Sequence, residues 1–291
     1  MSYAVIGAGK MGRWFTRFFL KEGYNVKVIE KDKRKFPIIK EEFGVDATED
    51  YSVIKDVEHI LLTVPIDNFE EAVKSIQPYT RREHVIMDVC SLKNEPVKLM
   101  HKYLRESLTL GMHPLFGPGA KDIRGHNIIL TPVKDREREF AQKFRVWLEE
   151  RGAHVYLMNP REHDELMSIV LCLPHFIGLL ACDTLIEFKN FALAKKISGS
   201  SFKMLITLAE SVASEDEEFY ATIHTSTPKA ELIEKMFLKK CRQWIKIIEA
   251  KDKRAFAEKM RDVKMRIGEV DSEYVKSYEK MYKILDLIND V

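Results

Sequence analysis

The feature that most constrains the fold is a glycine-rich turn near the start of the chain. A short apolar run at residues 2–6 leads straight into this turn, and an amphipathic stretch begins near Met11. The turn reads Gly7-Ala8-Gly9-Lys10-Met11-Gly12. In such a turn the first glycine permits a sharp bend, the second lets backbone N–H groups approach a ligand, and the third allows close packing of a helix on a strand. The run therefore predicts a strand, a turn and a helix that open an α/β fold.

The same turn predicts a site for a dinucleotide, because unpaired N–H groups and the helix dipole favour anions at the start of a helix. The predicted cofactor-binding residues of the turn are Gly7, Gly9, Lys10, Met11 and Gly12. The next strand ends in Glu30, 18 residues beyond Gly12, where a carboxylate binds the ribose hydroxyls of adenosine. A carboxylate also repels the 2′-phosphate of NADP, so we expect NAD. NADP remains the alternative, because neighbouring cations can neutralise that phosphate; they are Lys31, Lys33 and Arg34.

The first half of the chain alternates short apolar runs with amphipathic stretches, which is typical of a parallel sheet with crossover helices. Strands are predicted at residues 2–6, 25–30, 58–64, 84–89, 108–112, 127–131 and 154–158. Helices are predicted to start near Met11, Phe69, Glu95 and Asp135. Residues 1–158 are therefore predicted to form a Rossmann-type dinucleotide-binding domain.

From about Pro160 the pattern changes, because long stretches follow the helical period and no further strand alternation appears. Residues 159–291 are predicted to form an all-helical domain for substrate binding and dimerisation. Pro174 lies inside its first apolar helix, so a kink or break is expected just before His175. The predicted fold class is α/β, with an N-terminal Rossmann-type domain followed by an all-helical C-terminal domain.

Composition is typical of a soluble globular protein. Lys and Arg total 47 against 45 for Asp and Glu, a formal net charge of +2. The overall charge therefore does not favour binding to nucleic acid. No metal-ligand spacing appears among the nine histidines and four cysteines, and no metal is expected. The cysteines lie far apart in apolar surroundings, which indicates reduced, buried thiols in a cytoplasmic protein; they are Cys90, Cys172, Cys182 and Cys241.

One segment, residues 166–182, is nearly all apolar and imitates a membrane span. Pro174, His175 and the following Asp183 would each be costly in hydrocarbon, so no span is expected. The start of the chain has no basic segment followed by a long apolar region, so no signal peptide is expected either.

Three further segments lie where open α/β sheets bind ligands, at the carboxyl ends of strands. They are Thr63-Val64-Pro65-Ile66, Asp88-Val89-Cys90-Ser91-Leu92-Lys93-Asn94 and Gly111-Met112-His113-Pro114-Leu115-Phe116-Gly117-Pro118. With the glycine turn, this order resembles prephenate dehydrogenases. Glu162-His163-Asp164 and Leu173-Pro174-His175 extend the resemblance, which spans about residues 3–225. Val64 and Pro65 are accordingly predicted to border the nicotinamide of the cofactor.

The resemblance implies oxidative decarboxylation of prephenate to 4-hydroxyphenylpyruvate, with hydride passing from ring C4 to NAD. Loss of hydride from a carbon bearing a hydroxyl builds positive charge there, which a neutral imidazole relieves by accepting the hydroxyl proton. His113 is the candidate base. Ser91 would hydrogen-bond the same hydroxyl or orient the imidazole, as the matching serine does in the family. His175 matches a family histidine that lies against a substrate carboxylate.

Each of these residues also has a structural interpretation. His113 could cap a strand end, Ser91 could be a helix N-cap, and His175 could be a satisfied core residue of an apolar helix. For His163 and Asp164 we expect a structural role, capping and pairing at the start of the long helix.

The chain departs from the family where the substrate's carboxylates would bind. Bacterial members carry an arginine after a turn in the helical domain, whereas residues 199–208 contain only Lys203 as a basic residue. A lysine cannot form the two parallel hydrogen bonds with which arginine binds a carboxylate. Lys203 is the candidate substrate ligand, or else a snorkelling surface lysine. Arogenate therefore remains an alternative substrate. A related hydroxyacid or imine reductase, and a non-catalytic NAD-binding regulator, are the alternative functions.

A homodimer is also expected. The second half carries more apolar helix surface than a lone bundle would cover, and the family dimerises through this region.

Overall fold

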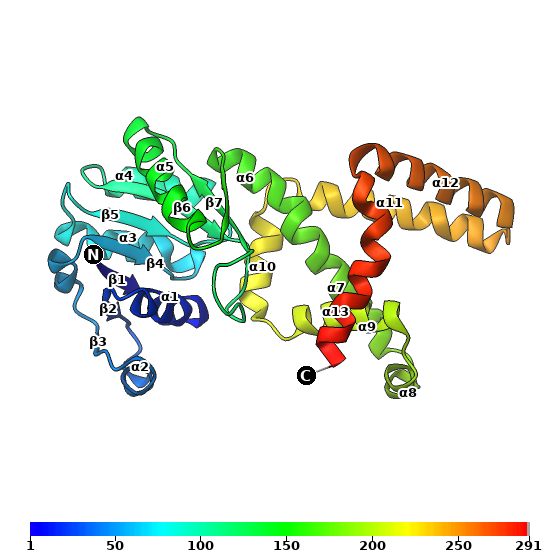
Figure 1. Cartoon of the computed structure of the whole chain (residues 1–291), viewed down its shortest axis with the longest axis horizontal. Helices are drawn as coiled ribbons and strands as arrows, with labels where there is room; N and C mark the ends of the chain where they lie inside the picture. Colours follow the sequence, from blue (N-terminus) through cyan, green and yellow to red (C-terminus); the bar gives the residue numbers. More distant parts are fainter. Residues whose placement is uncertain (290–291) are drawn as a thin grey trace. The chain divides into compact units, whose positions relative to one another are not determined.

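The computed structural model describes residues 1–289, and the chain divides into two compact units (Figure 1). The first unit is Met1–Leu166, and the second begins at Met167. The first unit includes most of helix α6 (Pro160–Met167), because side chains of that helix bond to it, as described below. The domain division predicted between residues 158 and 159 stays a prediction.

The first unit is built on one eight-stranded sheet in the order β3-β2-β1-β4-β5-β6-β7-β8. Its strands are β1 (Ser2–Ile6), β2 (Asn25–Ile29), β3 (Ala47–Thr48), β4 (His59–Leu62), β5 (Val85–Asp88), β6 (Leu108–Pro114), β7 (Asn127–Thr131) and β8 (His154–Leu157). All neighbouring pairs are parallel except β6 and β7, which run antiparallel. The chain winds in opposite directions on the two sides of β1, so the carboxyl ends of β1 and β4 border a topological switch point, where such sheets bind ligands.

Helices cover both faces of this sheet. α1 (Lys10–Lys21) and α5 (Asp135–Glu149) pack on one face, and α3 (Phe69–Ile76) and α4 (Asn94–Tyr103) pack on the other. Alternate residues of β1 enter the two cores: Val5 joins the α1 side, and Ala4 and Ile6 join the α3 side. This period of two is the one a strand buried on both faces must show. The remaining helices of the unit are α2 (Phe36–Phe43) and the 3₁₀ turns Lys33–Lys35, Tyr51–Asp56, Ile66–Asn68 and Gln77–Tyr79.

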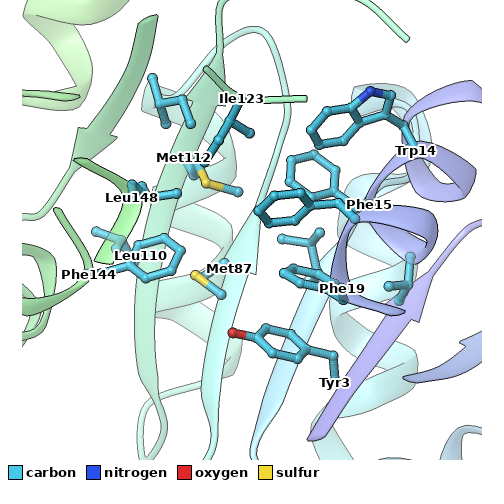
Figure 2. Packing of buried hydrophobic residues seen from close by; sticks show 14 of the residues in the cluster. Tyr3, Trp14, Phe15, Phe19, Met87, Leu110, Met112, Ile123, Phe144 and Leu148 are labelled. Atoms are coloured by element: carbon cyan, nitrogen blue, oxygen red, sulfur yellow. The ribbon is translucent and has the colours of Figure 1, made fainter. Parts of the chain in front are cut away.

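The core on the α1 face is rich in aromatic rings (Figure 2). Tyr3 of β1 stacks on Phe19 of α1 with ring centroids 3.8 Å apart, and Trp14 meets Phe15 edge-on at 4.9 Å. The indole N–H of Trp14 donates to the carbonyl of Ala120 at 2.6 Å. Aromatic contacts of this kind stabilise beyond their buried area. They fix α1 on the sheet and thereby place the glycine turn that precedes it.

The structure confirms the predicted strands and helices of this half, with small shifts at their ends, and reveals two more elements. β3 has only two residues, and α2 buries only Ile39, so neither shows a clear periodic pattern. Strand β6 continues through His113, past its predicted end at residue 112, because His113 pairs with Ile129 of the antiparallel β7. His113 is therefore the next-to-last residue of β6, directly before Pro114 at the strand end.

The second unit is helical throughout its described part, as predicted. A π-helical turn (Ser168–Cys172) leads from α6 into α7 (Leu173–Ile186). The helices that follow are α8 (Phe191–Lys196), α9 (Ser200–Ala213), α10 (Glu217–Ser226), α11 (Ala230–Glu249), α12 (Lys253–Val270), the 3₁₀ turn Ser272–Lys276 and α13 (Ser277–Asn289). Pro174 lies in the first turn of α7, where its missing N–H costs little. The helical distortion lies in the π-helical turn before it, and the chain stays helical on both sides.

Little of the apolar surface of the second unit is buried within one chain. Its cluster of buried apolar residues consists of Cys172, Ile223 and Ala230, packed against the partly buried Leu171. Large apolar side chains are exposed along its helices, among them Ile169, Val170, Leu179, Leu180, Ile186, Leu232, Met236, Ile245 and Ile248. Pro160–Ile186 is also long and apolar enough to cross a membrane, with a window of mean hydropathy 2.0, by length and composition alone. The absence of a membrane span stays a prediction.

All four cysteines are free. Cys90 and Cys172 are buried as predicted, whereas Cys182 and Cys241 are half-buried. Cys172 lies in the buried apolar cluster of the second unit, whereas Cys182 and Cys241 lie on the partly uncovered helices α7 and α11.

Candidate active site

The glycine turn has the local geometry expected from its residues. Gly7 has a φ of +95°, a conformation that residues with a side chain rarely adopt. A Cβ atom on Gly12 would lie 1.9 Å from the carbonyl oxygen of Gly7 and 2.7 Å from Oγ1 of Thr63, so only glycine lets α1 approach the sheet this closely. A Cβ on Gly9 would meet nothing within 4 Å. Space for a ligand therefore lies over the second glycine, next to the helix start.

The start of α1 suits an anion. Gly9 is the N-cap, no side chain caps the helix there, and no acidic residue lies in its first turn. Lys10 and Met11 begin the helix, Lys10 exposed and Met11 half-buried. Backbone N–H groups and the positive end of the helix dipole thus combine in a site that fits the pyrophosphate of a dinucleotide.

Glu30 lies directly behind this turn. Its Oε2 accepts from the backbone N–H of Ala8 at 2.8 Å and from Nζ of Lys35 at 3.0 Å, and its Oε1 accepts from the N–H of Asp32 at 3.0 Å. Burial alone would raise the pKa of Glu30, but these N–H groups and the ammonium of Lys35 together lower it. Glu30 is thus a charged carboxylate that hydrogen-bonds to the glycine turn through the N–H of Ala8.

The basic residues after Glu30 are engaged with carboxylates. Lys31 pairs with Glu71, Lys33 with Glu49 at 3.0 Å, and Arg34 with Asp32 at 2.8 Å. Lys35, which sequence reasoning did not single out, is the cation that contacts Glu30 itself.

The carboxyl ends of β1, β4 and β5 lie in register with each other and with the middle of β6. Ile6 of β1 pairs with Leu62 of β4, Leu62 with Asp88 of β5, and Asp88 with Gly111 of β6. The candidate residues after these positions are therefore brought to one edge, as predicted from the carboxyl ends of parallel strands. This edge adjoins the glycine turn.

The segment after β4 contacts the glycine turn directly. Oγ1 of Thr63 lies 2.9 Å from the carbonyl oxygen of Ile6 and 2.7 Å from that of Gly7, within donating distance of both. A Cβ on Gly7 would lie 3.1 Å from Cγ1 of Val64. The half-buried Val64 therefore lies beside the turn, and the exposed Pro65 follows it in the chain.

The segment after β5 is held by a buried ion pair. Nζ of Lys93 contacts the Asp88 carboxylate and donates to the carbonyl oxygen of Met112 at 2.8 Å, and both Lys93 and Asp88 are fully buried. Burial raises the pKa of Asp88, and the ammonium of Lys93 opposes that shift. This pair bridges β5 and β6 and fixes the loop that carries Ser91.

Ser91 is half-buried in that loop and does not cap α4. The N-cap of α4 is Lys93, so the interpretation of Ser91 as an N-cap is wrong. The capping group comes instead from α6: the Asp164 carboxylate accepts from the N–H of Lys93 at 2.7 Å and from the N–H of Asn94 at 2.9 Å. Asp164 therefore caps a helix about 70 residues earlier in the chain, not the helix it belongs to.

Asp164 is also one end of a buried chain of side chains. Its Oδ1 lies 2.7 Å from Nδ1 of His163, and Nε2 of His163 lies 2.8 Å from Nδ1 of His113. The exposed fractions of Asp164, His163 and His113 are 3%, 0% and 5%. The candidate base is thus held by a second histidine, which a carboxylate holds in turn.

Burial in this cluster keeps the imidazoles neutral. The pKa of His113 is lowered well below 6.5, first by burial and then by the neighbouring His163 and the Lys93 ammonium. The pKa of His163 is lowered by burial, although the contact with Asp164 opposes that shift. A neutral His113 is the form that can accept a proton.

His175 belongs to the second unit and has its own cluster there. Its ring lies 4.4 Å from that of Tyr220 and 6.1 Å from that of His224, both in α10. Nδ1 of His224 is 2.8 Å from a Glu234 carboxylate oxygen. Nδ1 of His175 and Nε2 of His224 are buried atoms without a hydrogen-bond partner in the described structure. The interpretation of His175 as a satisfied core residue is therefore wrong.

Lys203 is half-buried in the first turn of α9. α7, which carries His175, packs on the carboxyl-terminal part of α9: a Cβ on Gly178 would lie 3.0 Å from Cγ2 of Val212. At 1.5 Å per residue, Lys203 is about 15 Å along α9 from that end. The structure does not bring the two predicted substrate ligands together within one chain.

Sequence reasoning missed three features of the site. Two of them are the contact of His163 with His113 and the capping of α4 by Asp164. Local patterns could not predict these contacts, because the partners are distant in sequence, although Glu162-His163-Asp164 is one of the motifs that carry the family resemblance. His224 gave no signal at all. Among the described residues, no group of three or more His, Cys, Asp or Glu side chains could hold a metal.

Two family profiles match successive segments of the chain. A family profile described as "Prephenate dehydrogenase, nucleotide-binding domain" matches residues 15–157. A second, described as "Prephenate dehydrogenase, dimerization domain", matches residues 159–262.

Individual proteins agree with these profiles. A "Probable arogenate/prephenate dehydrogenase" of Methanocaldococcus jannaschii is 28% identical over 266 residues, which are 90% of this chain and 60% of that relative. A T-protein of Enterobacter agglomerans is 24% identical over 269 residues, 91% of this chain and 67% of that protein. The chain thus spans about 60% of the first relative's length.

Solved structures show the same fold. Prephenate dehydrogenase from Aquifex aeolicus, in complex with hydroxyphenyl propionate and NAD+, superposes with a TM-score of 0.76 at 21% identity, covering 93% of this chain and 98% of that one. Synechocystis arogenate dehydrogenase gives 0.70 at 19% identity, covering 93% and 100%. Because the two family profiles together match well over half of the residues, the chain belongs to the prephenate dehydrogenase family.

Proposed function

We propose that this protein is an NAD-dependent dehydrogenase that oxidatively decarboxylates prephenate to 4-hydroxyphenylpyruvate. The observation that carries the proposal is the placement of His113. Its neutral imidazole lies at the carboxyl edge of the sheet, beyond the row of strand ends that adjoins the glycine turn, and is held through Nδ1 by His163. A base in that position, beside a dinucleotide site, suits removal of a hydroxyl proton coupled to hydride loss.

The residues of the glycine turn would hold the dinucleotide. Backbone N–H groups at the start of α1 would bind the pyrophosphate, Glu30 the adenosine ribose, and Val64 and Pro65 would border the nicotinamide. Bound NAD would supply the hydride acceptor. His113 would accept the proton of the C4 hydroxyl, and Ser91 would hydrogen-bond that hydroxyl or orient the imidazole.

NAD is proposed over NADP because Glu30 is a charged carboxylate. Its lowered pKa keeps it ionised at neutral pH, so it would repel a 2′-phosphate. Lys31, Lys33 and Arg34 are paired with other carboxylates, and Lys35 pairs with Glu30 itself.

The substrate's carboxylates are proposed to bind in the second unit. His175 has an unsatisfied buried nitrogen, and so does the neighbouring His224, which Glu234 holds through its other nitrogen. Nδ1 of His175 can donate to a carboxylate oxygen when it carries the proton of the ring. Lys203 stays a proposed ligand, from a separate place on α9.

Arogenate is the second candidate substrate, because no arginine stands where bacterial members place one and because the Methanocaldococcus jannaschii relative is named for both substrates. A non-catalytic NAD-binding regulator is disfavoured by the buried His113 and His163 pair. A hydroxyacid or imine reductase is disfavoured because residues 165–190 contain no lysine in a Gly-x-x-x-Lys pattern.

We also propose a homodimer in the cytoplasm, with no membrane or nucleic-acid partner. The exposed apolar helices of the second unit support this, because a surface of that extent needs a partner and the matching profile is described as a dimerization domain. Sedimentation of the full chain at micromolar concentration tests it, and a stable monomer would contradict it.

A matrix of two cofactors and two substrates tests the activity. NAD or NADP is combined with prephenate or arogenate, and the absorbance of the reduced nicotinamide is followed. The expected result is the fastest reduction with NAD and prephenate. Faster reduction with arogenate would select the second candidate, and no reduction in any combination would sink both.

A further inference from the structure

We propose that His163 and Asp164 are positioning residues that fix the tautomer of His113, so that Nδ1 of His113 carries the proton and Nε2 is the free base. The proposal rests on the proposed function, in which His113 is the base. It assigns a role to two residues for which the sequence indicated only local capping and pairing.

Asp164 sets the direction of the chain of hydrogen bonds. Its Oδ1 accepts from the N–H of Lys93 and its Oδ2 from the N–H of Asn94. These N–H groups open α4, where the helix dipole also favours a negative charge. Both oxygens thus already accept from fixed donors, and the carboxylate can only accept again from Nδ1 of His163, 2.7 Å away.

His163 passes this constraint to His113. With its one proton on Nδ1, a neutral His163 has a bare Nε2, which is an acceptor. Nδ1 of His113, 2.8 Å from that atom, must then be the donor. A neutral imidazole has only one N–H, so Nε2 of His113 is left without a proton and can accept one.

The charges around the two rings favour this neutral arrangement. The Lys93 ammonium lowers the pKa of both histidines, while Asp164 and Asp88 act in the opposite direction on His163. Both rings are almost fully buried, and burial is the largest cause of each shift. A second proton on either ring, which would reverse the donor and acceptor roles, is therefore disfavoured.

The same carboxylate also positions Ser91. Asp164 holds the backbone N–H of Lys93, two residues after Ser91, while the side chain of Lys93 is tied to Asp88. One residue of α6 thus fixes both the tautomer of the candidate base and the end of the loop that carries its candidate partner.

The tautomer can be observed directly, without measuring activity. In nitrogen NMR spectra of the full chain labelled at histidine and saturated with NAD, protonated and bare ring nitrogens give well-separated signals. We expect His113 to carry its proton on Nδ1, with His113→Asn used to assign the signals. A proton on Nε2 of His113 in the unmodified protein would overturn the proposal, whatever the fate of the proposed function.

Asp164→Ala tests the origin of the constraint. It removes the acceptor for the Nδ1–H of His163, so His163 and therefore His113 can adopt either tautomer. The proton of His113 should then no longer be confined to Nδ1, and turnover should fall by at least about 10-fold while NAD affinity stays nearly unchanged. An unchanged His113 signal with near-normal turnover would show that Asp164 does not set the tautomer.

Two variants of His163 separate positioning from mere packing. The carbonyl of His163→Gln can accept from Nδ1–H of His113, whereas His163→Leu cannot. We expect the glutamine variant to retain at least about 10-fold more turnover than the leucine variant and to keep the His113 signal on Nδ1. Equal loss in both would overturn the proposal.

The matched control is His101→Leu. His101 forms another histidine–carboxylate pair of the first unit, with Nε2 2.6 Å from Oε1 of the buried Glu137. Its loss should lower the thermal midpoint without changing turnover or the His113 signal. Should His113→Asn itself keep normal turnover, the proposed function fails, while the tautomer assignment is still judged by the NMR signal.

Discussion

Nδ1 of His113 lies 2.8 Å from Nε2 of His163, although 50 residues separate the two histidines in the chain. β6 carries the first and α6 the second, so the contact forms only when the helix that follows the sheet folds back against its edge. The contact with His163 holds the ring of His113, which is buried from solvent. The predictions below follow from it and from the surrounding site.

Replacing the candidate base should remove most of the catalysis. His113→Asn should lower turnover by roughly 100-fold to 10,000-fold, the usual contribution of a general base. NAD affinity should stay nearly intact, because the glycine turn and Glu30 are untouched. Steady-state kinetics and cofactor titration measure the two effects. Near-normal turnover with both prephenate and arogenate would mean that the base lies elsewhere.

The pH dependence should reflect the depressed pKa of His113. The base acts when neutral and is lost when it binds a proton, so activity falls as pH drops through its pKa. Burial, His163 and Lys93 lower that pKa well below 6.5. The profile of kcat/KM, which reports the free enzyme, should therefore stay level down through pH 6.5 and fall only below it. An acid limb centred at or above pH 6.5 would contradict this environment.

The cofactor preference should depend on Glu30. Glu30→Ala should weaken NAD binding and improve the relative use of NADP, because it removes both the ribose ligand and the repulsive charge. Glu30→Gln is the matched variant, since it can still accept from the N–H of Ala8 but carries no charge. Comparing the two by titration separates support of the turn from repulsion of the phosphate. Equal NAD affinity in the alanine variant would sink the assignment.

The substrate end should affect binding more than chemistry. His175→Ala is expected to raise the Michaelis constant more than it lowers turnover, because a carboxylate contact holds ground and transition states alike. Tyr220→Phe serves as the control, since it keeps the ring that packs on His175. A large fall in turnover at unchanged Michaelis constant would place His175 in the chemistry instead.

Local patterns in the sequence were sufficient for the order of elements and for part of the site. The glycine turn is predictable because the roles of Gly7 and Gly12 depend on backbone conformation and the missing Cβ, which are properties of the residues themselves. The strands are predictable because burial on both faces demands continuous apolar runs. β3, with two residues, and α2, which buries only Ile39, gave no such signal.

Only the tertiary structure decided how the catalytic candidates are held. Asp164 caps α4 rather than its own helix, His163 bonds to His113, and Lys35 rather than its neighbours pairs with Glu30. Each of these contacts joins groups that are brought together by the packing of whole helices and strands. Local sequence propensities do not encode that packing. A sequence therefore determines which helices and strands form, while the partners of its buried polar groups depend on how those elements pack together.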